Sequence, residues 1–150
     1  MKKVLSILFA ALFLLVLIPS APVKAETITD VVYFEDGSYM VTVLQEYSTR
    51  STNQKSASKS QKYHASNGEL ACTLTVHGTF RYDGTTVTCT ASSYTHQIHN
   101  SSWSFSSGSA SKSGNTATAK GTFARKVLGI TVDSKTLTVS LSCDKNGNLS

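Results

Sequence analysis

The sequence lacks the short motifs by which hydrolases and metalloproteins are usually identified. No serine lies in a Gly-x-Ser-x-Gly elbow, and neither a Cys-x-x-Cys nor a His-Glu-x-x-His spacing occurs. His96 and His99 come nearest to a metal pair, but residues three apart on a strand point to opposite faces. We therefore predict no catalytic residue, no cofactor and no metal site.

Pairs of reactive side chains are lacking as well. Cys72 and His77 are five residues apart on one predicted strand, which places the thiol and the imidazole on opposite faces and disfavours a nucleophile–base dyad. A glycosidase needs two carboxylates held opposite each other. Four acidic residues instead stand in turns or at strand ends, where carboxylates bond the backbone: Asp36, Asp83, Asp133 and Asp144.

Long apolar runs are lacking after residue 18. Before that point Lys2 and Lys3 precede an uncharged run over 4–18, and Val23 and Ala25 offer the small residues that a signal peptidase reads. The run is about 15 residues, shorter than the roughly 20 that cross a bilayer as a helix. We predict a signal peptide over 1–25, cleaved after Ala25, with an uncleaved anchor as the alternative.

Signals for attachment to the cell are also lacking. No cysteine follows the small residues of the cleavage region, and the last residues form neither an apolar tail nor a wall-sorting motif. The expected location is therefore secreted and extracellular, with release into the medium or loose retention at the cell surface, and no membrane span after signal cleavage.

The positive charge is concentrated in one segment. Without its leader the chain carries eleven cations and nine acids, a net charge of only +2. Residues 48–68 contain no apolar periodicity and are predicted to form a flexible basic Ser/Thr-rich loop. Its cations could bind an anionic polymer through counterion release, although we prefer the interpretation of a merely solvated loop; they are Arg50, Lys55, Lys59 and Lys62.

Helical periodicity is absent, and an alternation of period two takes its place. Residues 26–47 are predicted to form a β-hairpin around Asp36-Gly37, because both central residues of a type I′ turn need positive φ. Further strands are expected in the main region 69–150, at 70–80, 87–91, 102–106, 117–123 and 137–143. The chain is predicted to be a single all-β domain, an antiparallel β-sandwich of about seven strands or a small barrel.

Three cysteines leave one over if a disulfide forms after export. A two-residue turn at 83–84 would place Cys72 and Cys89 about six residues apart in register, too far for a bridge. Cys89–Cys143 is the predicted disulfide, and Cys72 is then a buried thiol or an intermolecular bridge. The spacing of Cys89, Trp103 and Cys143 is immunoglobulin-like in appearance, but the tyrosine expected two residues before the last cysteine is replaced by Leu141.

Aromatic residues are few, and Trp103 is the only tryptophan. Together with Tyr94 and Phe105 it could form a platform on which a sugar stacks. Aromatic residues at alternating strand positions more often belong to the core, and we prefer that interpretation.

Three segments, 78–84, 111–117 and 141–150, resemble small secreted proteins of unknown function from Gram-positive bacteria. The resemblance covers roughly residues 70 to 150. It implies a bacterial source and an extracellular β-domain, and it transfers no functional residue.

From these observations we expect a non-catalytic binding or interaction module at the cell surface or in the medium. Its partner would be a cell-wall polymer or another secreted or surface protein, and no specific nucleic acid. A secreted toxin or bacteriocin-like factor is the first alternative, because the chain is small and its basic segment is predicted to be flexible. A cell-wall or carbohydrate-acting enzyme is the second.

Overall fold

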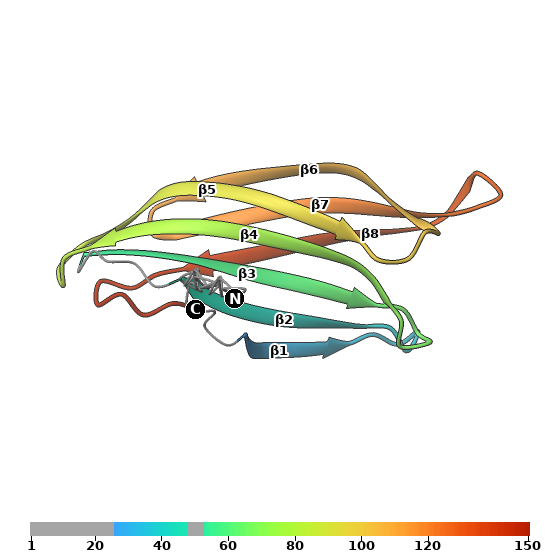
Figure 1. The fold of residues 1–150 in the computed structure, drawn as a ribbon, viewed down its shortest axis with the longest axis horizontal. Helices are drawn as coiled ribbons and strands as arrows, with labels where there is room; N and C mark the ends of the chain where they lie inside the picture. The colour runs from blue at the N-terminus through green and yellow to red at the C-terminus, as the bar shows by residue number, and fades with distance from the viewer. Residues whose placement is uncertain (1–25, 48–52) are drawn as a thin grey trace, which may run out of the picture.

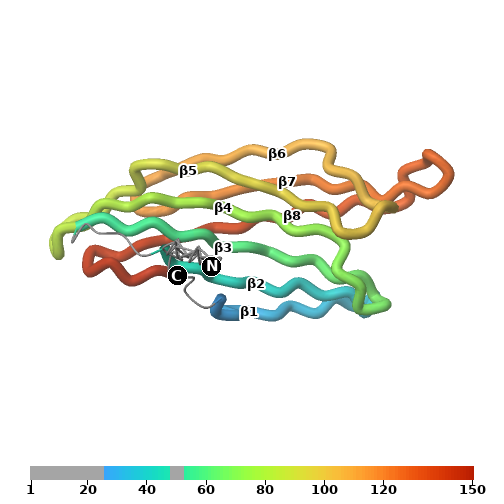
Figure 2. Tube along the Cα trace, in the orientation of Figure 1, coloured from blue at the N-terminus to red at the C-terminus, as the bar shows by residue number. Residues whose placement is uncertain are grey.

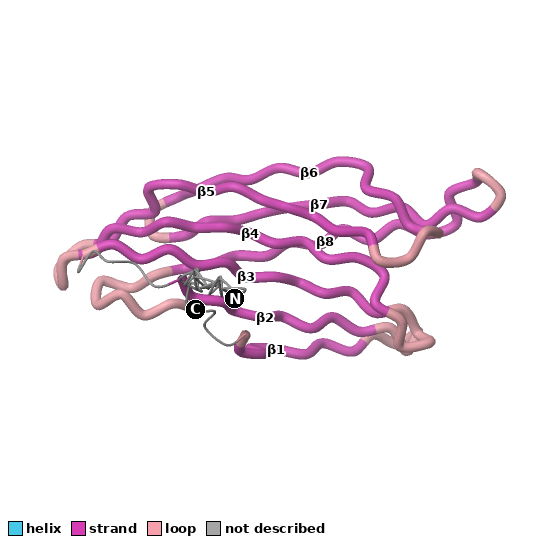
Figure 3. The backbone as a smooth tube through the Cα atoms, viewed as in Figure 1, coloured by secondary structure: helices cyan, strands magenta, loops and turns pink. Residues whose placement is uncertain are grey.

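Alternating polar and apolar residues form eight antiparallel strands. The computed structural model describes residues 26–47 and 53–150, which contain no helix and hence none that could span a membrane. The strands are β1 (Thr27–Tyr33), β2 (Tyr39–Tyr47), β3 (Gln54–His64), β4 (Leu70–Tyr82), β5 (Val87–Ile98), β6 (Trp103–Ser113), β7 (Thr116–Val127) and β8 (Ile130–Ser142) (Figures 1 and 3). The predicted all-β class is confirmed.

The strands make two sheets in the order of the sequence. Strands β1 to β5 form a five-stranded sheet, β6 to β8 form a three-stranded sheet, and every neighbour in a sheet is also a neighbour in the chain. The smaller sheet packs against β3, β4 and β5, so that the β1–β2 side of the larger sheet extends past it (Figure 2). The result is a sandwich, as predicted, but its plain meander differs from the Greek-key order of an immunoglobulin domain.

The core lies between the two sheets. Strand β4 contributes Leu74, Val76 and Phe80, all fully buried, and the facing side of β7 carries the small residues Ala117 and Ala119. Trp103 is buried in the same cluster, with Tyr94 and Phe105 packed against it. The preferred assignment of these three aromatic residues to the core is thus confirmed.

The predicted flexible loop at 48–68 is wrong over most of its length. Residues 54–64 are strand β3, hydrogen-bonded to β2 on one side and to β4 on the other. Its only buried apolar residues are Ala57 and Tyr63, too few to make an apolar periodicity visible. Hydroxyl pairs across the ladder take the place of apolar contacts on the other face, as between Ser60 and Thr75 at 2.8 Å.

The predicted hairpin at 26–47 is confirmed. Gly37 has a φ of 81°, which an L side chain rarely adopts, and the Asp36 carboxylate accepts the Ser38 amide at 2.9 Å. At Asp83-Gly84 a turn also forms, but Tyr82 pairs with Val87 rather than with Thr85, so the loop is two residues longer than predicted. This longer loop and a bulge after Thr79 shift all the pairings between β4 and β5 away from those that a two-residue turn would give.

The predicted Cys89–Cys143 disulfide is also wrong. Cys72, Cys89 and Cys143 are all free and buried. The β6–β7 turn bonds to the backbone of two of them, because Cys89 donates its amide to Gly114 and Cys143 donates its amide to Asn115. The thiol of Cys89 donates to the Ala91 carbonyl at 3.3 Å instead of forming a bridge, and that of Cys143 to its neighbour's carbonyl. Spacing along the chain could not reveal this arrangement between strands of different sheets.

Thiol titration distinguishes the two arrangements directly. In denaturant without reductant, we expect three thiols per chain to react with a disulfide reagent. In native buffer the reaction should be slow, because burial raises the pKa of the Cys72 thiol to about 12 and that of the other two thiols above the ordinary value. A single reactive thiol after denaturation would contradict the structure and support the predicted disulfide between Cys89 and Cys143.

Candidate functional site

The outer face of the five-stranded sheet carries a polar hollow of about 570 Å³. Strand alternation places it there, because Cys72, Leu74 and Val76 of β4 point into the core and the residues between them point outward. Four adjacent strands, β2 to β5, supply most of the lining, and Glu26 and His99 lie just outside them. Its principal polar groups are those of Ser60, Thr75, His77, Thr95 and Gln97.

The histidines of this hollow are held by hydroxyl groups. His77 Nε2 lies 3.0 Å from Thr95 Oγ1, and His99 Nε2 lies 3.0 Å from Thr73 Oγ1. Partial burial lowers the pKa of His77, so its imidazole is neutral at neutral pH. A neutral imidazole offers one donor and one acceptor, and the hydroxyls beside it offer both.

The hollow has almost no net charge. Of the described residues that line it, only Glu26 and Lys62 are charged, and these two form an ion pair at 3.0 Å. At its rim the Tyr47 ring is 42% exposed, while the phenol oxygen is hydrogen-bonded to Ser58 at 2.8 Å. The hollow therefore combines uncharged hydrogen-bonding groups with one exposed aromatic ring.

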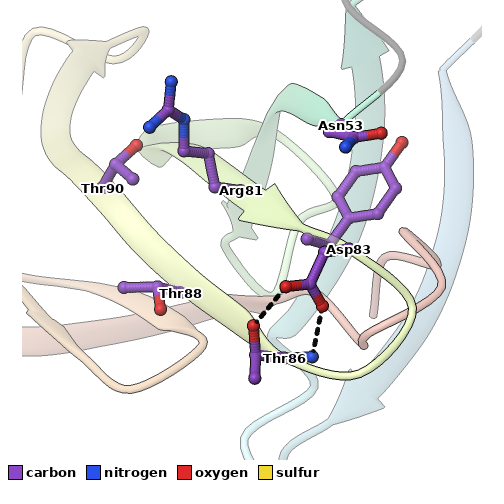
Figure 4. Close-up of a pocket in the computed structure, with 7 residues that line it drawn as sticks. Asn53, Arg81, Asp83, Thr86, Thr88 and Thr90 are labelled. Atoms are coloured by element: carbon purple, nitrogen blue, oxygen red, sulfur yellow. Dashed lines mark hydrogen bonds between the residues drawn. The ribbon is translucent and has the colours of Figure 1, made fainter.

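A second hollow, of about 540 Å³, lies by the β4–β5 turn (Figure 4). Arg81 stands there on the side of Thr90, away from the carboxylate of Asp83. That carboxylate accepts the Thr85 and Thr86 amides at 2.8 and 2.6 Å, and these bonds, chiefly that from Thr86, lower its pKa. Asp83 therefore stabilises the turn, as the sequence predicts. Arg81 is the cation that lines this hollow.

Of the four cations predicted to bind an anionic polymer, the three lysines that the structure describes are not brought together. Arg50 lies outside the described residues. Lys62 points to the outer face of the sheet, whereas Lys59 points to the inner face, where it lines a groove beside β8. Lys55 is 3.7 Å from Glu46. Because 54–64 is a strand, its alternation separates side chains that a loop could have gathered.

The histidine and cysteine pairs are separated as the alternation predicts. The His96 ring stacks on Phe105 of the other sheet with centroids 3.7 Å apart, while His99 bonds to Thr73 on the outside. Cys72 is fully buried, and His77 lines the outer hollow. Within 26–47 and 53–150, no group of three His, Cys, Asp or Glu side chains could hold a metal ion.

The hollow on the outer face escaped prediction, because it depends on β3 lying in the middle of the sheet. Its only signal in the sequence is the run of serines and threonines at alternate positions of several segments, which reads equally well as a solvated surface. No family model, no curated protein and no solved structure matches this chain.

Proposed function

We propose that the chain is exported and acts as a non-catalytic module that binds a neutral polysaccharide of the cell surface or the surrounding medium. The observation that carries the proposal is the uncharged polar hollow across β2 to β5. Export rests on the leader pattern of residues 1–25.

The chemistry of the hollow suits a sugar chain better than an ion or an apolar ligand. Sugar hydroxyls donate and accept at once, and so do the hydroxyl, amide and imidazole groups of Ser60, Gln97 and His77. The ion pair of Lys62 with Glu26 leaves no unopposed charge in the hollow for an anion. The exposed ring of Tyr47 offers an apolar face against which a sugar ring can stack.

The test is co-sedimentation with insoluble bacterial cell-wall polysaccharide from which the phosphate-containing polymers have been stripped. We expect binding that persists at about 1 M salt, where charge interactions are screened beyond about 3 Å. The double variant His77→Ala, Gln97→Ala should bind about 10- to 30-fold more weakly, since each lost hydrogen bond contributes about 1 kcal/mol.

The matched control is Thr122→Ala, Thr136→Ala. These two hydroxyls pair at 3.1 Å on β7 and β8, on the outer face of the other sheet, and their loss should leave binding unchanged. Equal losses in both double variants would contradict the assignment of the site. Binding abolished by salt, or no binding to stripped wall, would contradict the neutral-sugar proposal.

A further inference from the structure

The β7–β8 hairpin ends in an exposed apolar tip. In Figure 1 this hairpin projects beyond the other turns at its end of the sandwich. The side chain of Leu128 is 98% exposed, that of Ile130 69% and that of Val132 54%, and Val127 is exposed as well. Neighbouring apolar side chains exposed together at a projecting tip are characteristic of a contact surface.

The backbone of the tip makes the choice of leucine unusual. Leu128 has a φ of 50° and Gly129 a φ of 80°, the conformation of a two-residue turn in which asparagine or glycine is ordinarily found first. Leu128 is the single non-glycine residue with positive φ among the described residues. A strained, exposed leucine contributes nothing to the core, so its presence indicates a role outside the fold.

The tip has one apolar face and two cations beside it. Val127 and Ile130 are directly opposite each other in the ladder and share a face, whereas Lys126 and Thr131 are paired on the other. The charged residues nearest the tip along its two strands are Arg125 and Lys126 on β7 and Asp133 on β8. Asp133 lies opposite Arg125 in the ladder and 4.0 Å from Lys135, which also pairs with Asp36 at 3.7 Å.

We propose that this tip inserts into an anionic lipid surface. Leu128, Val127 and Ile130 would enter the acyl boundary, and Lys126 and Arg125 would lie at the level of the negative headgroups. An apolar tip with two cations beside it, and with its one neighbouring acid, Asp133, next to Lys135, complements such a surface in both polarity and charge. The proposal goes beyond polysaccharide binding and does not depend on the outer hollow, which lies on the other sheet.

The test uses the chain expressed with its leader, exported, and recovered from the medium. Co-sedimentation with phosphatidylcholine vesicles containing phosphatidylglycerol should show binding, and vesicles of phosphatidylcholine alone should show much less. Leu128→Asn should lower partitioning about tenfold, the contribution of one buried leucine. Asparagine tolerates the left-handed conformation, so this variant should unfold at the same or a higher temperature than the parent.

Tyr33→Ser is the control, since Tyr33 is also exposed but lies on β1. It should leave vesicle binding unchanged. Failure of the parent chain to bind anionic vesicles, or undiminished binding by Leu128→Asn, would overturn the proposal. The parent chain could instead fail to bind vesicles but dimerise as its concentration rises. If Leu128→Asn abolished that dimerisation, the partner of the tip would be a second copy of the chain and not a lipid surface. Polysaccharide binding by the same variant separates this outcome from failure of the proposed function.

Discussion

Replacing Phe80 by alanine should destabilise the protein by about 3–5 kcal/mol, the range found for deleting a buried aromatic ring. Phe80 is fully buried in the middle of the core. Its ring lies over Gly78, so closely that a Cβ on that glycine would be 2.8 Å from two ring atoms and 3.2 Å from Ala117 of the facing sheet. Gly78 and Ala117, which lie beside the ring, are too short to fill the cavity that its loss would leave.

Urea unfolding of the parent and the variant measures this loss. Phe34→Ala is the matched control, because Phe34 is 40% exposed beside the β1–β2 turn and should cost about 1 kcal/mol or less. Equal losses for Phe80→Ala and Phe34→Ala would contradict a core placed between the sheets.

Ser60→Pro should destabilise the protein by about 2–4 kcal/mol, because a ladder hydrogen bond is lost and its acceptor is left unpaired, and in a small domain this can abolish folding. Ser60 lies in the interior of β3, opposite Val43 of β2 and Thr75 of β4. Proline cannot donate to a ladder and is tolerated in sheets only at edges and bulges. A flexible loop at the same position would accept proline without loss.

The control for this substitution is Ser66→Pro. Ser66 is exposed at the second position of the β3–β4 turn, which the Gly68 amide closes on the Ala65 carbonyl, and proline suits that position. The melting temperature should fall sharply for Ser60→Pro and stay near that of the parent for Ser66→Pro. Two equally tolerated variants would show that β3 is not a central strand.

The elements that sequence reasoning located are those with alternating apolar side chains. Leu74 and Val76 identify β4, and Gly37 and Gly84 lie in turns that the Asp-Gly pairs of the sequence predict. Strand β3 was missed because its outward face is stabilised by hydroxyl pairs and hydrogen-bonded ladders, whose residue types are also those of loops. Composition alone cannot distinguish such a strand from a loop, whereas the structure shows its pairings with β2 and β4.

The candidate site was less predictable than the fold. Its residues come from four strands whose side chains gather only after registers are fixed, and two bulges alter those registers. The predicted polymer-binding lysines are separated for the same reason, since Lys59 and Lys62 differ by three positions on a strand and therefore point to opposite faces. Turn chemistry was the exception, because the Asp83 carboxylate acts on residues only two and three positions away.

The order of the strands also has a consequence for how the protein is made. Because each strand except β6 pairs with the one before it, every ladder can close as soon as its second strand is free to fold, and few distant segments must find one another. The larger sheet is complete once Ile98 has emerged, with Leu74, Val76 and Phe80 still uncovered until the last three strands arrive. Nascent chains halted near that residue should therefore be the form most in need of a chaperone.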